Sequence, residues 1–405
     1  MSQPEDTGPL RGVRVVDLSS VIMGPLTTRI LADFGADVIK VESPEGDVMR
    51  LAGPARHRGM SAPFMLLNRS KRSVVLDLKE RAARDAFLRL CAAADVLVHN
   101  TRAGAMRRLA LEYADVVRVN PAIVYVGLVG AGQGGPYADR PIYDDIVQGA
   151  SGLASLFERS GEARPRYVPL TISDRVGGLS AANAVLAALF ARQRDGRGQA
   201  IEVPLFETMV DVVLGDHLGG FAFDPPVGPS GYDRVLAPSR RPFQTKDGFV
   251  CILLYNEAHW QRFFELTGSA ARYAADRKLS NPDARRENYD YAYGVVAEIV
   301  ATRASADWLR LLPAADIPVM PLHDIESLLD DPHLKATGFF EVHEHPSEGR
   351  IRAPAIATQF GETTPRAQRP APLLGEHTEE VLREIGFEGS ALEALRHNST
   401  PCSRA

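Results

Sequence analysis

The sequence has little cysteine: only Cys91, Cys251 and Cys402 occur in 405 residues, and no CxxC pair is present. A disulfide-stapled scaffold and a cysteine-rich metal centre are therefore excluded, and a reducing compartment is favoured. The first residues, MSQPEDTG, also lack the basic start and apolar core of a signal peptide. We expect a cytoplasmic protein.

Long apolar runs and an excess of positive charge are missing too. No stretch approaches the roughly 18 to 20 apolar residues that cross a bilayer, so no membrane association is expected. The formal net charge of -5 leaves no basic excess for holding a polyphosphate backbone, so nucleic acid is not an expected partner. With 45% hydrophobic residues the chain can bury a large core, and its length predicts two domains.

Metal-binding and dinucleotide-binding motifs are also absent. His343 and His345 lie close together, but no HExxH or carboxylate spacing accompanies them. We therefore expect no metal site and interpret both histidines as surface residues. The segment GAGQGG, at 130–135, leads to Pro136 rather than to a helix, so it is interpreted as a turn.

What the sequence does have is a regular alternation of apolar strands and amphipathic helices. The strands are expected to be apolar throughout, at 13–18, 36–42, 73–78, 95–100 and 123–130. Helices are expected from Pro25 to Gly35 and from about 80 to 94, and a separate helical stretch is expected between the strand at 95–100 and about residue 119. Such strands predict a parallel sheet covered on both faces. The fold class is therefore α/β, with a doubly wound, Rossmann-like large domain.

The second half of the chain predicts a smaller α+β domain. An alanine-rich helix at 176–194 is followed by DGRG and a short strand at 199–205, and glycine and proline then mark a linker at 219–231. Beyond it we expect a hairpin turning at 246–248, and helices near 259–266, 286–301 and 306–312. The predicted division is 1–218 for the first part of the large domain, 219–325 for the small domain and 326–405 for a segment that returns to the large domain.

The segment SDRVGG, at 173–178, stands at the entrance of the alanine-rich helix. Asp174 occupies the expected N-cap position, where an aspartate usually accepts hydrogen bonds from free backbone N–H groups. Gly177 and Gly178 are expected in the first turn, although each costs on the order of 1 kcal/mol relative to alanine. Glycine there suits the close approach of a ligand or another backbone, and a helix N-terminus attracts negative charge. The alternative to capping is therefore a carboxylate that attacks a carbonyl.

The helix with its flanks, DRVGGLSAANAVLAALFARQRDGRGQAIEVPLFE, resembles the signature of the class III CoA-transferase family, which contains formyl-CoA transferase and carnitine CoA-transferase. Other segments resemble the family in the same order along nearly the whole chain: VRVVDLSSVIMGPLTTRILADFGADVIKVESPEGD, NRSKRSVVLDLK, VLVHNTRAGAMRRLAL, GGPYADRPIYDDIVQGASG and APLLGEHTEEVLREIGF. The resemblance implies that Asp174 is a nucleophile, forming an aspartyl acyl anhydride and then an aspartyl-CoA thioester. A carboxylate of ordinary pKa, about 3.9, is ionised at neutral pH without a general base.

The resemblance also implies the ligands and partners. It implies CoA and acyl-CoA as substrates beside a small carboxylic acid, no tightly bound cofactor, and an interlocked homodimer. Backbone N–H groups around Gly177 and Gly178 would stabilise the oxyanion of each step. The residues implied for CoA binding are Ile22, Met23, Leu76, Asp77, Leu78, Lys79, Asn100, Thr101, Arg102, Arg108, Arg140 and Tyr143.

Some of these positions have a plain structural interpretation as well. Arg102 and Arg108 would pair with the phosphates of CoA. The alternative for Arg108 is a solvated helix face. The alternative for Leu76 and Leu78 is the apolar core, with only their backbone near the adenine.

Two departures from the family pattern bear on substrate choice. Ser43 stands where some members carry an arginine after the second strand. The segment 227–243 replaces the glycine-run loop that covers the active site of formyl-CoA transferase. Arg234, Arg240 and Arg241 of this segment would suit the second carboxylate of a dicarboxylate, and the alternative is a solvated loop.

Two other functions stay open. An α-methylacyl-CoA racemase resembles the same family, but it needs acid/base groups on both faces of the α-carbon, and its relatives carry a histidine in a GHD-like motif. This chain has Tyr143 and Asp144 in that region, which favours the transferase. A non-catalytic acyl-CoA binding protein is the second alternative, and the intact Asp174 with its two glycines argues against it.

Overall fold

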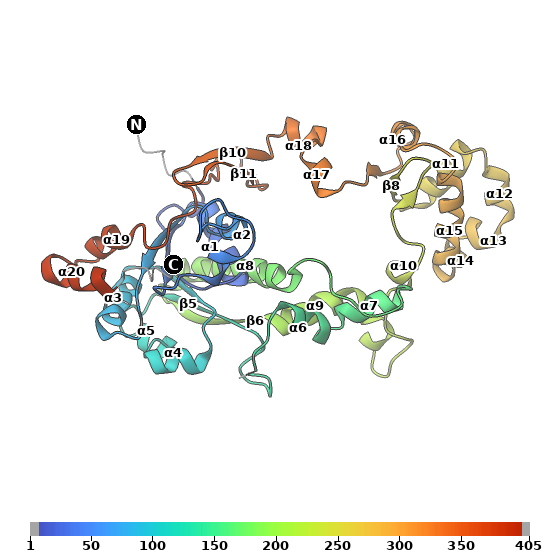
Figure 1. Ribbon diagram of the computed structural model, residues 1–405. Helices are drawn as coiled ribbons and strands as arrows, with labels where there is room; N and C mark the ends of the chain where they lie inside the picture. The colour runs from blue at the N-terminus through green and yellow to red at the C-terminus, as the bar shows by residue number, and fades with distance from the viewer. Residues whose placement is uncertain (1–7, 139, 399–405) are drawn as a thin grey trace. The chain divides into compact units, whose positions relative to one another are not determined.

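The computed structural model describes residues 8–138 and 140–398, and the chain divides into two compact units (Figure 1). The large unit takes the residues up to Ser151, Val168–Asp211 and the residues from Lys335 onward; the small unit takes Gly152–Tyr167 and Val212–Leu334. The predicted division stays a prediction, and the two units differ from it at 152–167, 212–218 and 326–334. Within the small unit, Arg159 Nη2 donates to the carbonyl of Ser230 at 2.6 Å, which ties 152–167 to the glycine-rich segment.

The large unit contains a six-stranded sheet in the order β3-β2-β1-β4-β5-β6, and every neighbouring pair is parallel. The strands are β1 (Arg14–Leu18), β2 (Asp37–Glu42), β3 (Lys71–Val75), β4 (Val96–His99), β5 (Val124–Val129) and β6 (Gln199–Pro204). Strand order reverses at β1, so the carboxyl ends of β1 and β4 flank the topological switch point, where open α/β sheets bind ligands. The predicted doubly wound α/β fold is confirmed.

Helices cover both faces of this sheet. The helices of the large unit are α1 (Met23–Asp33), η1 (Val48–Leu51), α2 (Ala62–Asn68), α3 (Arg81–Ala92), α4 (Ala103–Leu109), α5 (Tyr113–Val116), α6 (Asp144–Ala150), α8 (Ile172–Asp195), α19 (Thr378–Glu384) and α20 (Gly389–Asn398). On one face α1 packs against β1, β2 and β4, and α8 packs against β5 and β6. On the other face Phe87 of α3 and Leu382 of α19 join a core that includes Val16 and Ile39. Gly35 ends α1 with a positive φ, as the sequence predicts.

The sheet is not apolar throughout, contrary to the prediction. Asp17 on β1, Lys40 on β2 and Lys71 on β3 are fully buried. Lys71 Nζ lies 3.0 Å from Asp17 Oδ2, and Lys40 Nζ lies 2.9 Å from Asp47 Oδ2. Burial by itself raises the pKa of Asp17, but Lys71 and Lys40 outweigh burial and hold that pKa well below its ordinary value. The buried charges are tolerated because each has an opposite charge beside it.

The small unit has its own core and an antiparallel sheet in the order β7-β8-β9. Its strands are β7 (Phe243–Gln244), β8 (Phe249–Ile252) and β9 (Val319–Pro321). Its helices are α7 (Leu153–Arg159), η2 (Gly219–Ala222), α10 (Asp233–Leu236), α11 (Glu257–Leu266), α12 (Ala270–Ala275), α13 (Arg277–Ser280), α14 (Pro282–Glu287), α15 (Tyr289–Val300), α16 (Ser305–Ala314) and α17 (Ile325–Leu328). The predicted hairpin at 246–248 is confirmed by the β7–β8 pairing. The sequence does not indicate β9, because Pro318 and Pro321 interrupt any strand pattern there.

Two helices cross the boundary between the units, α9 (Leu205–His217) and α18 (Pro332–Ala336). Beyond α18 the large unit is completed by the hairpin of β10 (Phe340–His345) and β11 (Gly349–Pro354), drawn in orange in Figure 1. The backbone N–H of His377 donates to the carbonyl of Ser73 on β3 at 2.9 Å. His345 is buried, with Nε2 at 2.9 Å from the carbonyl of Ala371, so its prediction as a surface residue is wrong.

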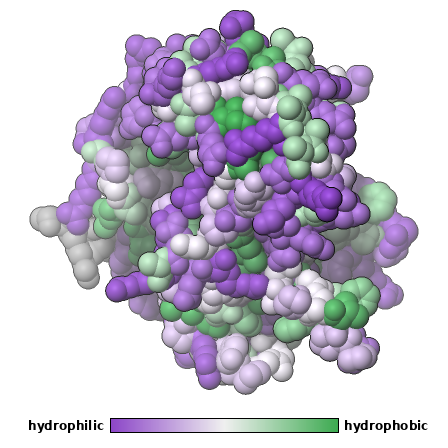
Figure 2. Space-filling model, turned by 90° about the vertical axis from the view of Figure 1, so that its right-hand side faces the viewer, coloured by the Kyte–Doolittle hydropathy of each residue, from purple (hydrophilic) through white to green (hydrophobic). Residues whose placement is uncertain are grey.

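Two further features concern helices and metal-binding groups among the described residues, and a third concerns the surface. Within 8–138 and 140–398, no helix has the length and apolar character needed to cross a membrane. The same residues contain no group of three or more His, Cys, Asp or Glu side chains placed to hold a metal ion. The face shown in Figure 2 is mostly hydrophilic, with apolar residues in small separate areas.

Candidate active site

A cavity of about 180 Å³, here called the Asp174 crevice, lies in the large unit at the switch point of the sheet. Its walls come from the loop after β1, the loop after β4, the end of β5 and the segment up to Tyr143. Asp174 of α8 and Leu205 complete the lining. The predicted nucleophile therefore lies in a cavity at the position where α/β sheets place their ligands.

Eight of the residues predicted for the site line this crevice together: Ile22, Met23, Asn100, Thr101, Arg102, Arg140, Tyr143 and Asp174. The other predicted residues do not line it: Leu76, Asp77, Leu78, Lys79, Arg108, Gly177 and Gly178. Residues 76–79 follow β3, the edge strand, which is separated from β1 by β2. Leu76 is buried in the core and Leu78 packs against it, so the core interpretation of these two leucines is confirmed. Arg108 is exposed in the last turn of α4.

Asp174 is the third residue of α8 and not its N-cap, which is Thr171. The capping prediction is therefore wrong, because the helix begins earlier than the alanine-rich run suggests. Its own backbone N–H donates to Oδ1 of Asp144 at 3.0 Å. Asp144 is buried at the start of α6, and its Oδ2 accepts a hydrogen bond from Gln148 Nε2 at 2.7 Å. The residue that caps this end of α8 is thus Asp144, and the side chain of Asp174 is left for another use.

The half-buried position of Asp174 changes its acidity. Burial is the main cause, the negative charge of Asp144 adds to it and Arg175 opposes it, and together they raise the pKa of Asp174 to about 6. The carboxyl does not keep the ordinary pKa assumed from the sequence. It is still mostly ionised at neutral pH, and a more basic carboxylate is a better nucleophile.

Gly177 and Gly178 lie in the second turn of α8, not in the first as predicted. A Cβ on Gly178 would lie 2.9 Å from the carbonyl oxygen of Met23, and a Cβ on Gly177 would lie 2.6 Å from Leu205 Cδ1. These glycines therefore let α8 pack closely against α1. Their N–H groups lie beyond the four free donors of the helix start, so the structure gives the predicted oxyanion role no free glycine donor.

Positive charge borders the crevice on one side. Arg102 is exposed, and its Nη2 lies 3.3 Å from the hydroxyl of Tyr143. Arg140 is exposed and stacks over the ring of Tyr137 at 4.5 Å. Both arginines are exposed and carry several N–H donors, so this rim suits an anionic ligand.

Comparison with known proteins shows the family. A model of CoA-transferase family III matches residues 10–378. The chain belongs to this family. It is 32% identical to the succinate–glutarate CoA-transferase of Agrobacterium fabrum, over 98% of this chain and 99% of that protein. It is 31% identical to the succinyl-CoA–L-malate CoA-transferase beta subunit of Chloroflexus aurantiacus, over 94% of each. A crystal structure of a CaiB/BaiF family protein from Brucella suis is similar with a TM-score of 0.79 and 29% identity, covering 94% of this chain and 100% of that one.

The chain is therefore an enzyme of the class III CoA-transferase type, and enzymes of this type use CoA thioesters as substrates. The Asp174 crevice of this CoA-transferase also has lining residues that the sequence does not predict for the site, among them Val21, Gln133 and Leu205. Asp144 and Gln148 stand directly behind it. Asp144 could have been suspected only from the acidic pair at 144–145 in the first turn of a helix.

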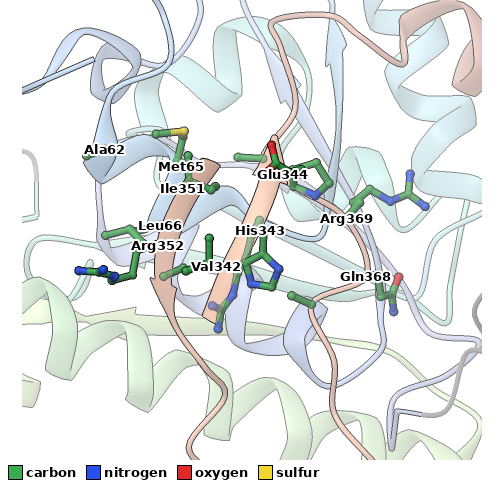
Figure 3. Close-up of a pocket in the computed structure, with 15 residues that line it drawn as sticks. Ala62, Met65, Leu66, Val342, His343, Glu344, Ile351, Arg352, Gln368 and Arg369 are labelled. Carbon is green, nitrogen blue, oxygen red and sulfur yellow. The ribbon is translucent and has the colours of Figure 1, made fainter. Parts of the chain in front are cut away.

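A second cavity of this CoA-transferase, of about 460 Å³, lies between α2 and the β10–β11 hairpin (Figure 3). Met65, Leu66, Val342 and Ile351 give it apolar walls, as Figure 3 shows. Its buried Arg69 is already held by both carboxylate oxygens of Asp33. Among the described residues that line this cavity, Glu344 is the carboxylate, and it is exposed rather than half-buried like Asp174.

The loop arginines predicted to hold a second carboxylate lie in the small unit. Arg234 Nε donates to the hydroxyl of Tyr293 at 3.1 Å, and Arg241 Nε donates to the carbonyl of Pro238 at 2.8 Å. Arg240 and Arg241 line a cavity of about 460 Å³ with Phe243 and Met320. Arg241 is thus engaged within the loop itself, and Arg234 is held by Tyr293 of α15.

Proposed function

We propose that this enzyme transfers CoA between carboxylic acids through covalent intermediates on Asp174. The carboxylate attacks the acyl-CoA thioester carbonyl, which forms an aspartyl acyl anhydride and releases CoA thiolate. The thiolate attacks the aspartyl carbonyl, and the donor acid leaves. The acceptor carboxylate then attacks the aspartyl-CoA thioester to give a second anhydride and CoA thiolate, which attacks the acceptor carbonyl and frees Asp174.

The observation that carries this proposal is the half-buried Asp174 carboxylate with its raised pKa, in the crevice at the switch point. The backbone N–H of Asp174 donates to the side chain of Asp144. The carboxylate oxygens of Asp174 itself are therefore not needed to accept this N–H. The start of α8 also supplies positive potential for the oxyanion of each step. The crevice holds only part of a CoA molecule, so we place the thioester end inside it and the nucleotide outside, toward residues 76–79 and Arg108.

Dicarboxylic acids are the proposed substrates. The names of two relatives specify succinate, glutarate and L-malate, all of them dicarboxylic acids. Arg102 and Arg140 border the crevice and suit a second carboxylate or a phosphate. We also propose a cytoplasmic homodimer with no tightly bound cofactor, and light scattering at about twice the mass of the 44.1 kDa chain would support the dimer.

Chemical trapping tests the mechanism. Enzyme incubated with succinyl-CoA and then treated with borohydride should carry a reduced Asp174, because borohydride converts an aspartyl thioester to an alcohol. Peptide mass spectrometry should locate the change in the peptide that contains Asp174, and Asp174→Asn should show none. Unchanged turnover by Asp174→Asn would rule the mechanism out. A panel of mono- and dicarboxylate acceptors with succinyl-CoA as donor would identify the substrate class.

The racemase alternative gains no support from the crevice. Among the described residues that line it, none is a histidine. Tyr143, at the corresponding position, is 64% exposed and contacts Arg102. Exchange of deuterium at the α-carbon of a branched acyl-CoA, without acyl transfer, would favour the racemase.

A further inference from the structure

The loop that follows β1 and leads into the first residue of α1, here called the Ser19–Met23 loop, has an unusual backbone. Val21 lies in the left-handed region with φ of +73°. A β-branched residue rarely adopts this conformation, and it persists only where the surroundings impose it. Val21, Ile22 and Met23 together form one wall of the Asp174 crevice. Contacts from the surrounding fold must therefore hold this wall in an energetically unfavourable backbone conformation.

The first restraint comes from beneath the loop. Lys40 on β2 is fully buried, and its Nζ donates to the carbonyl of Ser19 at 2.8 Å. The same ammonium pairs with Asp47 Oδ2 at 2.9 Å. Burial lowers the pKa of Lys40, but Asp17, Asp47 and Glu42 raise it above its ordinary value, so the ammonium stays charged.

The second restraint comes from the other oxygen of the same carboxylate. Asp47 Oδ1 accepts the backbone N–H of Val21 at 3.2 Å and that of Met49 at 3.0 Å. The backbone N–H of Asp47 in turn donates to Glu42 Oε2 at 3.0 Å. The Lys40–Asp47 pair is thus hydrogen-bonded to the loop backbone at Ser19 and at Val21.

The third restraint comes from the strand on the other side of β1. Asn100, directly after β4, accepts the N–H of Ser20 on Oδ1 at 3.1 Å and donates from Nδ2 to the carbonyl of Ser20 at 2.8 Å. Its amide is therefore used for the loop, although the family resemblance implies a contact with CoA. Three consecutive residues, Ser19, Ser20 and Val21, are fixed by side chains from β2, the segment after β2 and the end of β4.

Stability alone does not explain a buried ion pair at this place. Taking a lysine and an aspartate out of water costs about as much as their attraction returns, and apolar residues of similar size often serve as well. An apolar pair would, however, leave the N–H of Val21 and the carbonyl of Ser19 without partners. The buried charges are explained by the geometry of the loop, because only polar side chains can hydrogen-bond to the backbone of a loop that has no strand partner.

We propose that Lys40, Asp47 and Asn100 are positioning residues that hold the strained Ser19–Met23 loop as the wall against which the acyl-CoA thioester is aligned for attack by Asp174. This inference deepens the proposed function and rests on it. It assigns to Lys40 and Asp47 an effect on catalysis, although neither lines the crevice.

Steady-state kinetics of the full chain with succinyl-CoA and glutarate test the proposal. Lys40→Met removes the ammonium and keeps much of the side-chain length. We expect kcat/KM for succinyl-CoA to fall about 10-fold or more, mainly through KM, because small displacements of positioning groups are enough to disorient the reacting atoms. The matched control is Arg72→Met, which removes a buried cation whose partners all lie outside the crevice. It should lower stability and leave the kinetic constants of the folded enzyme unchanged. Lys40→Met with wild-type kinetics would overturn the proposal.

A second pair of variants covers the case in which Lys40→Met does not fold. Val21→Gly removes the strain, because glycine adopts positive φ freely. We expect an unchanged or higher melting temperature with kcat/KM reduced about 10-fold, as the loop leaves its imposed shape. Val21→Ala removes the same methyl groups but keeps an L side chain, so it measures the loss due to the shorter side chain alone, and Val21→Gly should fall below it. Wild-type kcat/KM in Val21→Gly contradicts the proposal.

Calorimetric titration with free CoA separates this inference from the proposed function. CoA should bind Lys40→Met about 10-fold more weakly than Arg72→Met, whatever happens at Asp174. Failure to trap an adduct on Asp174 in the wild type would reject the covalent mechanism, while the CoA titration would still decide the role of the loop. Equal CoA affinity in both variants would reject the positioning role.

Discussion

The two ends of the large unit's parallel sheet both carry ion pairs, but these pairs contact different things. Toward the carboxyl end, Lys40 and Asp47 are buried and hydrogen-bond to the backbone of the Ser19–Met23 loop. At the amino end, Arg72 pairs with Asp37 at 2.6 Å and with Glu380 of α19 at 2.9 Å. One network shapes a wall of the Asp174 crevice, and the other attaches α19 to the strands. Ion pairs of similar kind therefore fix the shape of a loop at one end of the sheet and stabilise the packing of a helix at the other.

This difference teaches where an ion pair affects activity. A pair that holds side chains of a helix can be lost at a cost in stability alone, because no backbone near the ligand depends on it. A pair that satisfies backbone groups of a loop also fixes the shape of that loop. Substitutions at the two ends should therefore separate into kinetic and thermodynamic effects.

The largest effect is expected at the carboxyl end, from Asp174→Asn. Loss of the nucleophile should lower transfer at least about 1,000-fold. The same change should raise the free energy of unfolding at pH 7, because burial and Asp144 make the ionised carboxylate unfavourable in the folded state. Enzyme assays and urea unfolding measure the two effects.

The sign of this stability change can be checked by pH. The folded-state pKa of Asp174 is about 6, above the unfolded value of 3.8, so the contribution to stability is present below pH 3.8 and lost as the pH rises through 6. The gain from Asp174→Asn should therefore be full at pH 7.5 and shrink toward pH 4. A gain in unfolding free energy that did not change with pH would show that the charge of Asp174 does not destabilise the folded state.

The second effect belongs to the amino end. Arg72→Met should cost about 2 kcal/mol of unfolding free energy, because it removes the buried cation that pairs with Asp37, Glu380 and Glu384. This loss of unfolding free energy is small for a buried ion pair, because these carboxylates are partly exposed. Urea unfolding measures it, and a large fall in kcat/KM of the folded variant would break the comparison.

The sequence predicts the main elements of this picture but not the contacts between them. The strand and helix alternation predicts the parallel sheet, and the segment around Asp174 predicts the candidate nucleophile. Asp144 was not predicted as a partner, because 30 residues separate it from Asp174 and folding alone brings them together. The buried Lys40 was assigned to an apolar strand, since a sequence pattern shows a charge but not its partner. Glycine at 177 and 178 suits the close approach of a ligand or another backbone, and the structure places the backbone carbonyl of Met23 against Gly178.

The third effect concerns the pH dependence of the carboxyl end. Asp144→Asn keeps an oxygen that can accept the N–H of Asp174 but removes the negative charge that raises the pKa of Asp174. The ionised form of Asp174 is then favoured, so its pKa should fall. The acid limb of kcat/KM should move down by up to about one pH unit. A limb that stays in place, or moves upward, would mean that Asp144 does not act on Asp174 through its charge.

The smallest effect is expected from Arg14, which joins the amino-end network from the first residue of β1. Its Nε lies 3.0 Å from Asp37 Oδ2 and its Nη2 lies 3.2 Å from Glu384 Oε2, but all three side chains are about one-third exposed. Exposed pairs contribute little, so Arg14→Met should cost less than about 1 kcal/mol. Because Arg14 and Arg72 share Asp37 and Glu384, their losses should not add. A double-mutant cycle in urea measures this coupling. Strict additivity would show that the amino-end charges act as separate pairs, and would confine networked behaviour to the buried carboxyl end.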